Sequence, residues 1–202
     1  MATTYDWPAS LPFSAARIAP RAISQSAGQT LSGVEAIEDS GATVWAGSIT
    51  VPIRSDAQVR TLRAIRSKLR GRVNRIRFDL DAVTRTALPS GLAAVGSFSI
   101  TAAAAIRDAT IEIDDSGFTI GDLVGCWVSI GDDWLHEVAS VDAGGSTMTI
   151  NPPLRAAVTT SDTVSLSPQF VARLTADDGL ALGIGVDGFG DMEFSVIEAF
   201  GR

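Results

Sequence analysis

Cysteine and histidine are almost absent from this sequence: the 202 residues include one cysteine, Cys126, and one histidine, His136. A single cysteine cannot form an internal disulfide, which argues against a small disulfide-linked secreted scaffold and favours a reducing compartment. Zinc sites need several cysteine or histidine ligands, and a Ser-His-Asp triad needs its histidine near a strained nucleophile turn. We therefore expect Cys126 to be a small core residue and His136 to be a packed or solvated strand residue.

The sequence also lacks a secretory signal and a convincing apolar run. Its first eight residues have neither the cationic start nor the apolar stretch of a signal peptide, so we expect no export by that route. Residues 86–106 carry no charge and reach the length of a membrane span, but only six of these 21 residues are leucine, isoleucine, valine or phenylalanine. We expect a linker that leads into a strand, and no membrane span.

The charges that are present are unevenly distributed. The net charge is −7, with 46% hydrophobic and 19% charged residues, a composition typical of one large or two small globular domains. Residues 54–77 contain nine basic side chains and one acid, whereas residues 78–202 contain 18 acids and five bases. Such a polarised molecule is suited to stack head to tail or to dock on an oppositely charged partner.

A strand followed by a helix is indicated in the first half of the chain. Residues 44–53 alternate between apolar and small or polar side chains, as a half-buried strand does. Ser55 and Gln58 have the spacing of a capping box, and apolar residues then recur every three or four positions. We predict a helix over residues 56–70, with Gly71 as its left-handed C-terminal cap.

Short β-strands dominate the remainder. Residues 73–80 alternate like a strand, and two turns rich in Gly and Asp, at 131–133 and 142–146, predict hairpins. Residues 1–20 contain three prolines and no clear period, so we expect an extended arm there. The other predicted strands are residues 98–101, 109–113, 126–130, 134–141, 147–150, 163–166, 170–174 and 192–200.

The order of these elements predicts a nested architecture of the mainly β (α+β) class. The spacing of the strands after residue 96 suits a small barrel or sandwich. We predict one β domain formed by residues 1–95 together with residues 168–202, and an inserted β-barrel module formed by residues 96–167.

Two patterns suggest ligand sites, but each has an ordinary structural explanation. Residues 183–188 fit the G-x-G-x-x-G phosphate motif, yet a strand-like segment follows where the motif requires a helix, so we expect a hairpin loop. Calcium is an open alternative for the acidic pairs, although turns collect aspartate for backbone reasons and no EF-hand spacing is present. We expect no cofactor, no metal and no catalytic residues. The pairs are Asp114-Asp115, Asp132-Asp133 and Asp177-Asp178.

The basic helix is the strongest candidate for an interaction surface. Its arginines could contact nucleic acid phosphates, but no aromatic residue that could stack on bases occurs between Trp45 and Phe78, and the protein as a whole is acidic. We favour ion pairs with acids of a neighbouring subunit and expect no nucleic acid partner. The candidate interface residues are Arg60, Arg63, Arg66, Arg70 and Arg72.

Taken in order, five segments resemble the distal tail protein family of phages with long non-contractile tails, and related minor tail proteins. Residues 45–53 (WAGSITVPI) and 69–78 (LRGRVNRIRF) are similar to the first strand and helix of that family. Residues 121–125 (GDLVG), 128–138 (VSIGDDWLHEV) and 150–155 (INPPLR) are similar to the module inserted in such proteins. The resemblance is spread over most of the chain.

This resemblance implies a structural, non-enzymatic protein of the virion tail, or baseplate, assembled in the cytoplasm of the bacterial host. The implied fold is a tail-tube-like β-sandwich with one helix and an inserted OB-like β-barrel. The implied assembly is a homo-oligomeric ring, a hexamer in this family, that connects the tail tube protein to the baseplate hub and tail-tip proteins. Receptor-binding proteins or fibres are further implied partners. The family has no catalytic residues to transfer to this chain.

A carbohydrate-binding, host-recognition module is the alternative function. Trp127 and Trp134 flank a predicted hairpin in the inserted segment, and exposed aromatic rings can stack on sugars.

Overall fold

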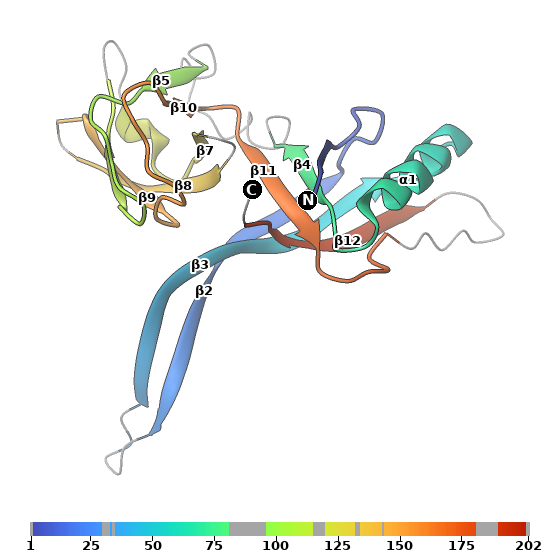
Figure 1. Ribbon diagram of the computed structural model, residues 1–202, viewed down its shortest axis with the longest axis horizontal. Helices are drawn as coiled ribbons and strands as arrows, with labels where there is room; N and C mark the ends of the chain where they lie inside the picture. The colour runs from blue at the N-terminus through green and yellow to red at the C-terminus, as the bar shows by residue number, and fades with distance from the viewer. Residues whose placement is uncertain are drawn as a thin grey trace.

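The described part of the protein is mainly β with one α-helix, as the sequence predicts, and its strands form two six-stranded sheets (Figure 1). The computed structural model describes residues 2–29, 33, 35–80, 96–114, 120–131, 134–142, 144–180 and 190–200. The first sheet has the order β1 (Thr4–Asp6), β4 (Arg75–Asp79), β11 (Gln169–Leu174), β12 (Asp191–Glu198), β3 (Glu35–Pro52) and β2 (Ala15–Gln29). The second has the order β5 (Ser97–Ser99), β10 (Thr163–Ser165), β7 (Trp127–Ile130), β8 (Trp134–Val141), β9 (Thr147–Asn151) and β6 (Thr110–Glu112).

The predicted helix is confirmed as α1 (Asp56–Leu69). Ser55 is its N-cap: the side-chain oxygen accepts a hydrogen bond of 3.3 Å from the backbone N–H of Gln58. The side-chain oxygen of Gln58 in turn accepts from the backbone N–H of Arg54, one residue earlier than a standard capping box places it. The predicted glycine cap is corrected, because the left-handed conformation already begins at Arg70 (φ 52°) and continues at Gly71 (φ 67°).

The apolar side of α1 and one face of the first sheet share a core. The helix contributes Val59, Leu62, Ile65 and Leu69, all buried and three or four positions apart. The predicted strand at 44–53 is confirmed as the last part of β3, which begins much earlier, at Glu35. Its alternating buried residues, including the fully buried Trp45 and Ile49, face this core.

The extended arm predicted for residues 1–20 is wrong. Strand β1 pairs in parallel with β4, Leu11 is completely buried, and β2 already begins at Ala15. The strand was not predicted because it contains a proline: Pro20 lies within β2, opposite Trp45. A proline is tolerated there because β2 is an edge strand, and the missing N–H breaks no ladder bond with a further strand.

Strands β2 and β3 form a long hairpin that projects from the body of the molecule (Figure 1). Only the part of β3 from Ala46 to Pro52 also pairs with β12. The part from Glu35 to Trp45 pairs with β2 alone. The projecting section is therefore a two-stranded ribbon without a third strand among the described residues, and no sequence pattern predicted it.

The second sheet is built from strands of one continuous stretch, which lies between β4 and β11 in the chain. The strands predicted in this stretch are confirmed to within two residues, and β8 has the predicted bounds. One antiparallel bridge, Ile100 to Ile113, links the ends of β5 and β6, but the described strands form no closed barrel. The OB-like character of residues 96–167, and the proposed domain boundaries, stay predictions.

Both hairpins of the second sheet form where the turn residues predict them, between β7 and β8 and between β8 and β9. The first turn lies partly outside the described residues, as does the second at residue 143. The glycine motif at 183–188 and residues 86–95 of the uncharged segment 86–106 also lie outside them. No helix in the described part of the chain is long and apolar enough to span a membrane.

Candidate functional site

The predicted interface arginines occupy the exposed side of α1 and its C-terminal end. Arg60, Arg63 and Arg66 point away from the core, and Arg70 is exposed at the C-cap. None of these four forms an ion pair with another described residue. Arg72 differs, because its side chain and backbone N–H both donate hydrogen bonds of 3.1 Å to the carboxylate of Asp177, whose pKa this contact lowers. Four of the five predicted residues are therefore available to another molecule.

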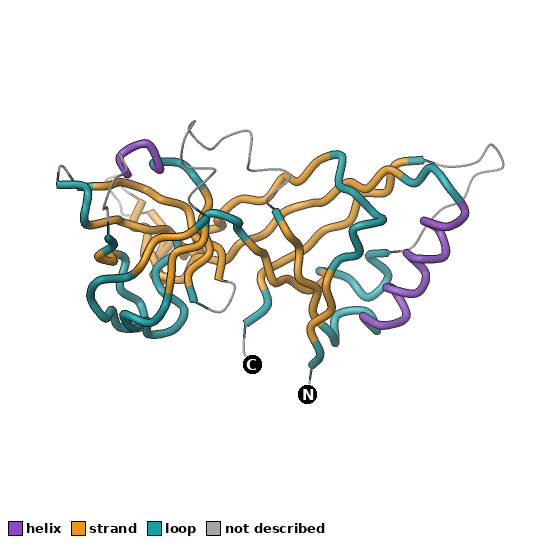
Figure 2. The backbone as a smooth tube through the Cα atoms, turned by 90° about the horizontal axis from the view of Figure 1, so that it is seen from above, coloured by secondary structure: helices purple, strands orange, loops and turns teal. Residues whose placement is uncertain are grey.

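Opposite charges gather at opposite ends of the molecule. Helix α1 lies at one end of the long axis and the second sheet at the other (Figure 2). Residues 96–167, which contain the whole second sheet, have ten acidic side chains and two arginines, a formal charge of −8. Exposed members of this acidic group are Asp108, Glu112, Asp114, Asp122 and Asp142.

The two sheets contact each other through the outer face of the β7–β8 hairpin. The indole N–H of Trp45 in β3 donates a 2.6 Å hydrogen bond to the backbone oxygen of Leu135 in β8. The Trp127 ring packs edge-on against the Trp45 ring, with 5.6 Å between centroids. The hydroxyl oxygen of Ser129 accepts a 2.7 Å hydrogen bond from the backbone N–H of Gln169 at the start of β11. Leu135 belongs to the core of the first sheet, which makes the contact part of that core.

A buried ion pair reinforces this contact. Glu198, at the end of β12, is 3% exposed, and its two carboxylate oxygens accept from Arg155 at 2.8 and 3.1 Å. The same carboxylate accepts a hydrogen bond from the backbone N–H of Trp45 at 3.0 Å. The Arg155 guanidinium also donates to the backbone oxygen of Thr43. Every carboxylate oxygen thus has a donor, as a buried charge requires.

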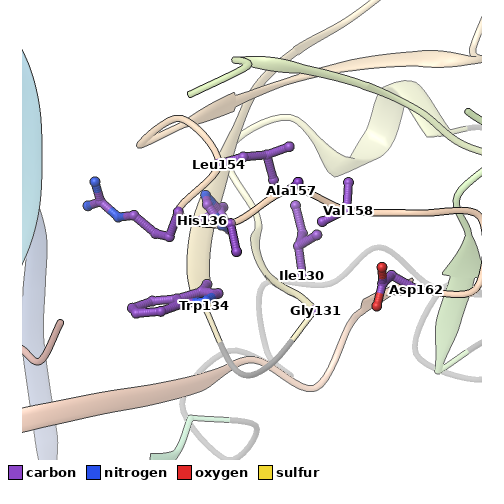
Figure 3. A pocket seen from close by; sticks show the side chains of 10 residues that line it. Ile130, Gly131, Trp134, His136, Leu154, Ala157, Val158 and Asp162 are labelled. Atoms are coloured by element: carbon purple, nitrogen blue, oxygen red, sulfur yellow. The ribbon is translucent and has the colours of Figure 1, made fainter. Parts of the chain in front are cut away.

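A small cavity lies on the other face of β8, next to Arg155 (Figure 3). Its volume is about 60 Å³, and Trp134 and His136, two residues apart on the same face of the strand, both line it. His136 is completely buried, and its Nδ1 lies 2.7 Å from the backbone oxygen of Pro152. Burial lowers the pKa of His136 to about 4, helped by the nearby charge of Arg155 and opposed by the Pro152 hydrogen bond. The imidazole is therefore neutral near pH 7.

Two nitrogen atoms of these side chains are buried without a hydrogen-bond partner among the described residues. They are Nε2 of His136 and Nε1 of Trp134. Next to the cavity is a more open hollow of about 410 Å³, lined in part by Trp134, Phe200 and Arg155. The Trp134 ring stacks on Phe200 with 6.3 Å between centroids, and the Arg155 guanidinium lies 4.9 Å from the centre of the Phe200 ring.

The structure places the remaining candidates as follows. As predicted, His136 is a packed strand histidine and Cys126 is a buried core residue. Burial raises the pKa of the Cys126 thiol. Trp127 and Trp134 are both half-buried and belong to opposite faces of the hairpin, so they form no shared exposed platform. No group of three or more potential metal ligands occurs among the described residues.

Sequence reasoning missed Arg155, Glu198 and the cavity. Arg155 and Glu198 are 43 positions apart and belong to different predicted domains, so no local pattern relates them. The available signal was the position of His136, a polar residue that lies between the apolar Trp134 and Val138 on one face of the strand. Comparison with protein-family models and with curated proteins finds no match to this chain.

Proposed function

We propose that this protein is a structural component of a phage tail tip that assembles into a closed ring and joins the tail tube to the baseplate hub. The observation that carries the proposal is the separation of charge along the molecule. A positive helix at one end and a negative sheet at the other are complementary between consecutive copies, so that one copy attracts the next head to tail. A heterologous contact of this kind produces a ring when the rotation that relates consecutive copies closes after a full turn.

The open edges of the first sheet support the same proposal. No described strand pairs with the outer side of β2 or with the outer side of β1. Both edges could extend by β-pairing with a neighbouring copy, and a ring would remove the aggregation hazard of a long exposed edge. In this arrangement the first sheet is the tail-tube-like β-sandwich element, and the second sheet is the OB-like insert whose acidic side faces α1 of the next copy.

The oligomeric mass as a function of salt tests this proposal. The variant carries Arg60→Glu, Arg63→Glu and Arg66→Glu, and the matched control carries lysine at the same three positions, which retains the charge. We expect the unmodified protein and the lysine control to form one defined oligomer that dissociates as salt screens the contact. We expect the glutamate variant to remain monomeric. Light scattering coupled to size-exclusion chromatography measures all three.

Two results would contradict the proposal. One is an unmodified protein that stays monomeric at high concentration, both alone and mixed with tail tube and hub proteins. The other is a glutamate variant that assembles as well as the lysine control, which would show that α1 is not at the contact.

The alternative of a carbohydrate-binding, host-recognition module has lost its original support. Trp127 packs against Trp45, and Trp134 stacks on Phe200, so the two rings are not presented together to a sugar. Only Trp134 remains next to an open hollow.

A further inference from the structure

The inner face of β8 holds a donor and an acceptor that no other described residue satisfies. Native proteins pair nearly all buried polar groups, so each exception requires an explanation. Here two such groups, Trp134 Nε1 and His136 Nε2, belong to side chains that line the same cavity. Figure 3 shows Trp134 and His136 beside the space that Ile130, Leu154 and Val158 also border.

The tautomer of His136 follows from its neighbour. A backbone oxygen can only accept, so the 2.7 Å contact with Pro152 requires the proton on Nδ1. The neutral ring then has a lone pair on Nε2, which acts as an acceptor. The indole Nε1 of Trp134 can only donate. The cavity therefore presents one donor and one acceptor, which a single hydroxyl group satisfies by accepting from Trp134 and donating to His136.

We propose that this cavity binds a hydroxyl group of a small neutral alcohol or polyol whose carbon skeleton occupies the adjoining hollow. This binding site goes beyond the structural role proposed above and does not depend on it. The cavity volume of about 60 Å³ equals roughly two waters, room for a hydroxymethyl group. The hollow shares Trp134, Leu154, Arg155 and Ala156 with the cavity, and Phe200 provides an apolar surface for carbon atoms.

The charges around the cavity favour a neutral ligand. The Arg155 guanidinium is already engaged by Glu198 and by the backbone oxygen of Thr43, so it has little left to offer an anion. The other charged residue in the lining, Asp162, accepts hydrogen bonds from the backbone N–H and the hydroxyl of Thr159. Arg155 therefore offers the cavity no unpaired positive charge for an anionic ligand, and the Asp162 carboxylate is held toward Thr159.

The indole N–H signals of the ¹⁵N-labelled full-length protein provide a direct test with glycerol as the probe. The chain has four tryptophans, and the indole N–H groups of Trp7 and Trp45 donate to backbone oxygens within the protein. We expect the Trp134 signal to shift in a saturable manner as glycerol is added, while those of Trp7 and Trp45 stay in place. The ¹⁵N shift of His136 Nε2 reports the other proposed hydrogen bond, which this atom accepts from the ligand hydroxyl.

Variants of the hairpin separate the proposed hydrogen bonds from general effects. Trp134→Phe keeps a ring against Phe200 but removes the donor, and we expect glycerol to bind about tenfold more weakly, as measured by the His136 signal. Trp127→Phe is the matched control on the opposite face of the same hairpin and should leave binding unchanged. His136→Gln retains an amide that can donate to Pro152 but moves the acceptor away from the position of Nε2, and the Trp134 signal should then saturate only at higher glycerol concentration.

Two further probes define the ligand. Methyl glucoside carries a hydroxymethyl group on a sugar ring, and tighter binding of methyl glucoside than of glycerol would identify a saccharide as the source of the hydroxyl. Dimethoxyethane has acceptors but no O–H, so it should bind more weakly than glycerol. If no probe gives a saturable shift of the Trp134 signal, the cavity holds ordered water only and the proposal is overturned. Equal binding to the Trp134→Phe variant would also overturn it.

Discussion

Arg155 and Glu198 show how a few residues secure the contact between the two sheets. The carboxylate of Glu198 is removed from water and receives donors from Arg155 and from the backbone of Trp45. Burying a charge is costly unless it is paired and hydrogen-bonded, and here both conditions are met. The pair therefore specifies one relative position of β12 and the segment after β9, because any other position leaves the carboxylate without its partners.

Removal of the Arg155 side-chain charge should consequently lower the stability of the fold. We expect Arg155→Met, which keeps much of the aliphatic stem, to lower the free energy of unfolding by about 3 kcal/mol, because Glu198 would stay buried without its counter-ion. The control is Arg54→Met, which breaks an exposed pair with Asp191 and should change stability little. Urea titrations of the three proteins make the comparison. Equal stability of the two variants would show that the buried pair has no special role.

His136 should make stability depend on pH in a defined window. Its pKa is about 4 in the folded protein and near 6.5 when the chain unfolds. Between these values the unfolded chain binds a proton that the folded protein does not, so stability falls as the pH is lowered from 6.5 to 4. The whole effect is on the order of 3 kcal/mol, and above pH 6.5 this contribution is constant.

The measurement is urea unfolding of the unmodified protein and of His136→Gln at pH 7.5, 5.5 and 4.5. His136 is the only histidine in the sequence, so the difference between the two pH profiles isolates its titration. We expect the variant to lose the additional decline below pH 6.5. Parallel profiles would mean that the imidazole is not buried as a neutral group.

At the scale of elements, the sequence predicted those whose periodicity is local and clear. Helix α1 and strand β8 have strong apolar patterns and recognisable ends, and their bounds were predicted to within one residue. Strand β2 was missed because Pro20 argues against a strand unless the strand lies at an edge, and edge position depends on contacts far along the chain. The candidate interface arginines could be predicted from the local composition. The cavity could not, because only the folded chain brings Trp134 and Leu154 together.

The base of the long hairpin depends on close contact between two strands. Gly47 in β3 lies opposite Ile18 in β2, and a Cβ at Gly47 would lie 1.9 Å from the backbone oxygen of Arg17. Any side chain at this position would force the two strands apart. Glycine is therefore required here by the close approach of the strand backbones.

We expect Gly47→Ala to lower the free energy of unfolding by about 2 kcal/mol, because the hairpin must separate locally to admit a methyl group. Gly190→Ala is the control: nothing lies within 4 Å of a Cβ at that position, and we expect almost no change. Thermal and urea unfolding measure both variants. If Gly47→Ala is as stable as the control, the two strands are not packed as closely as the structure indicates.

For the whole molecule, the essential feature is one elongated body with two sheets, a positive end and a negative end. The sheets are joined by the Trp45–Leu135 and Arg155–Glu198 contacts, so the charged ends are fixed relative to each other. A fixed separation of charge defines a direction for association and disfavours contact between like ends. The open edge of β2 adds a surface that a neighbouring strand could continue. Together these features fit a subunit of a ring.

Electron cryomicroscopy of the purified full-length protein at low salt tests the ring directly. We expect closed rings of one subunit number, in which α1 of each copy faces the acidic second sheet of the next and a strand of a neighbouring copy pairs with β2. Single copies, open filaments or rings with α1 directed to solvent would contradict it.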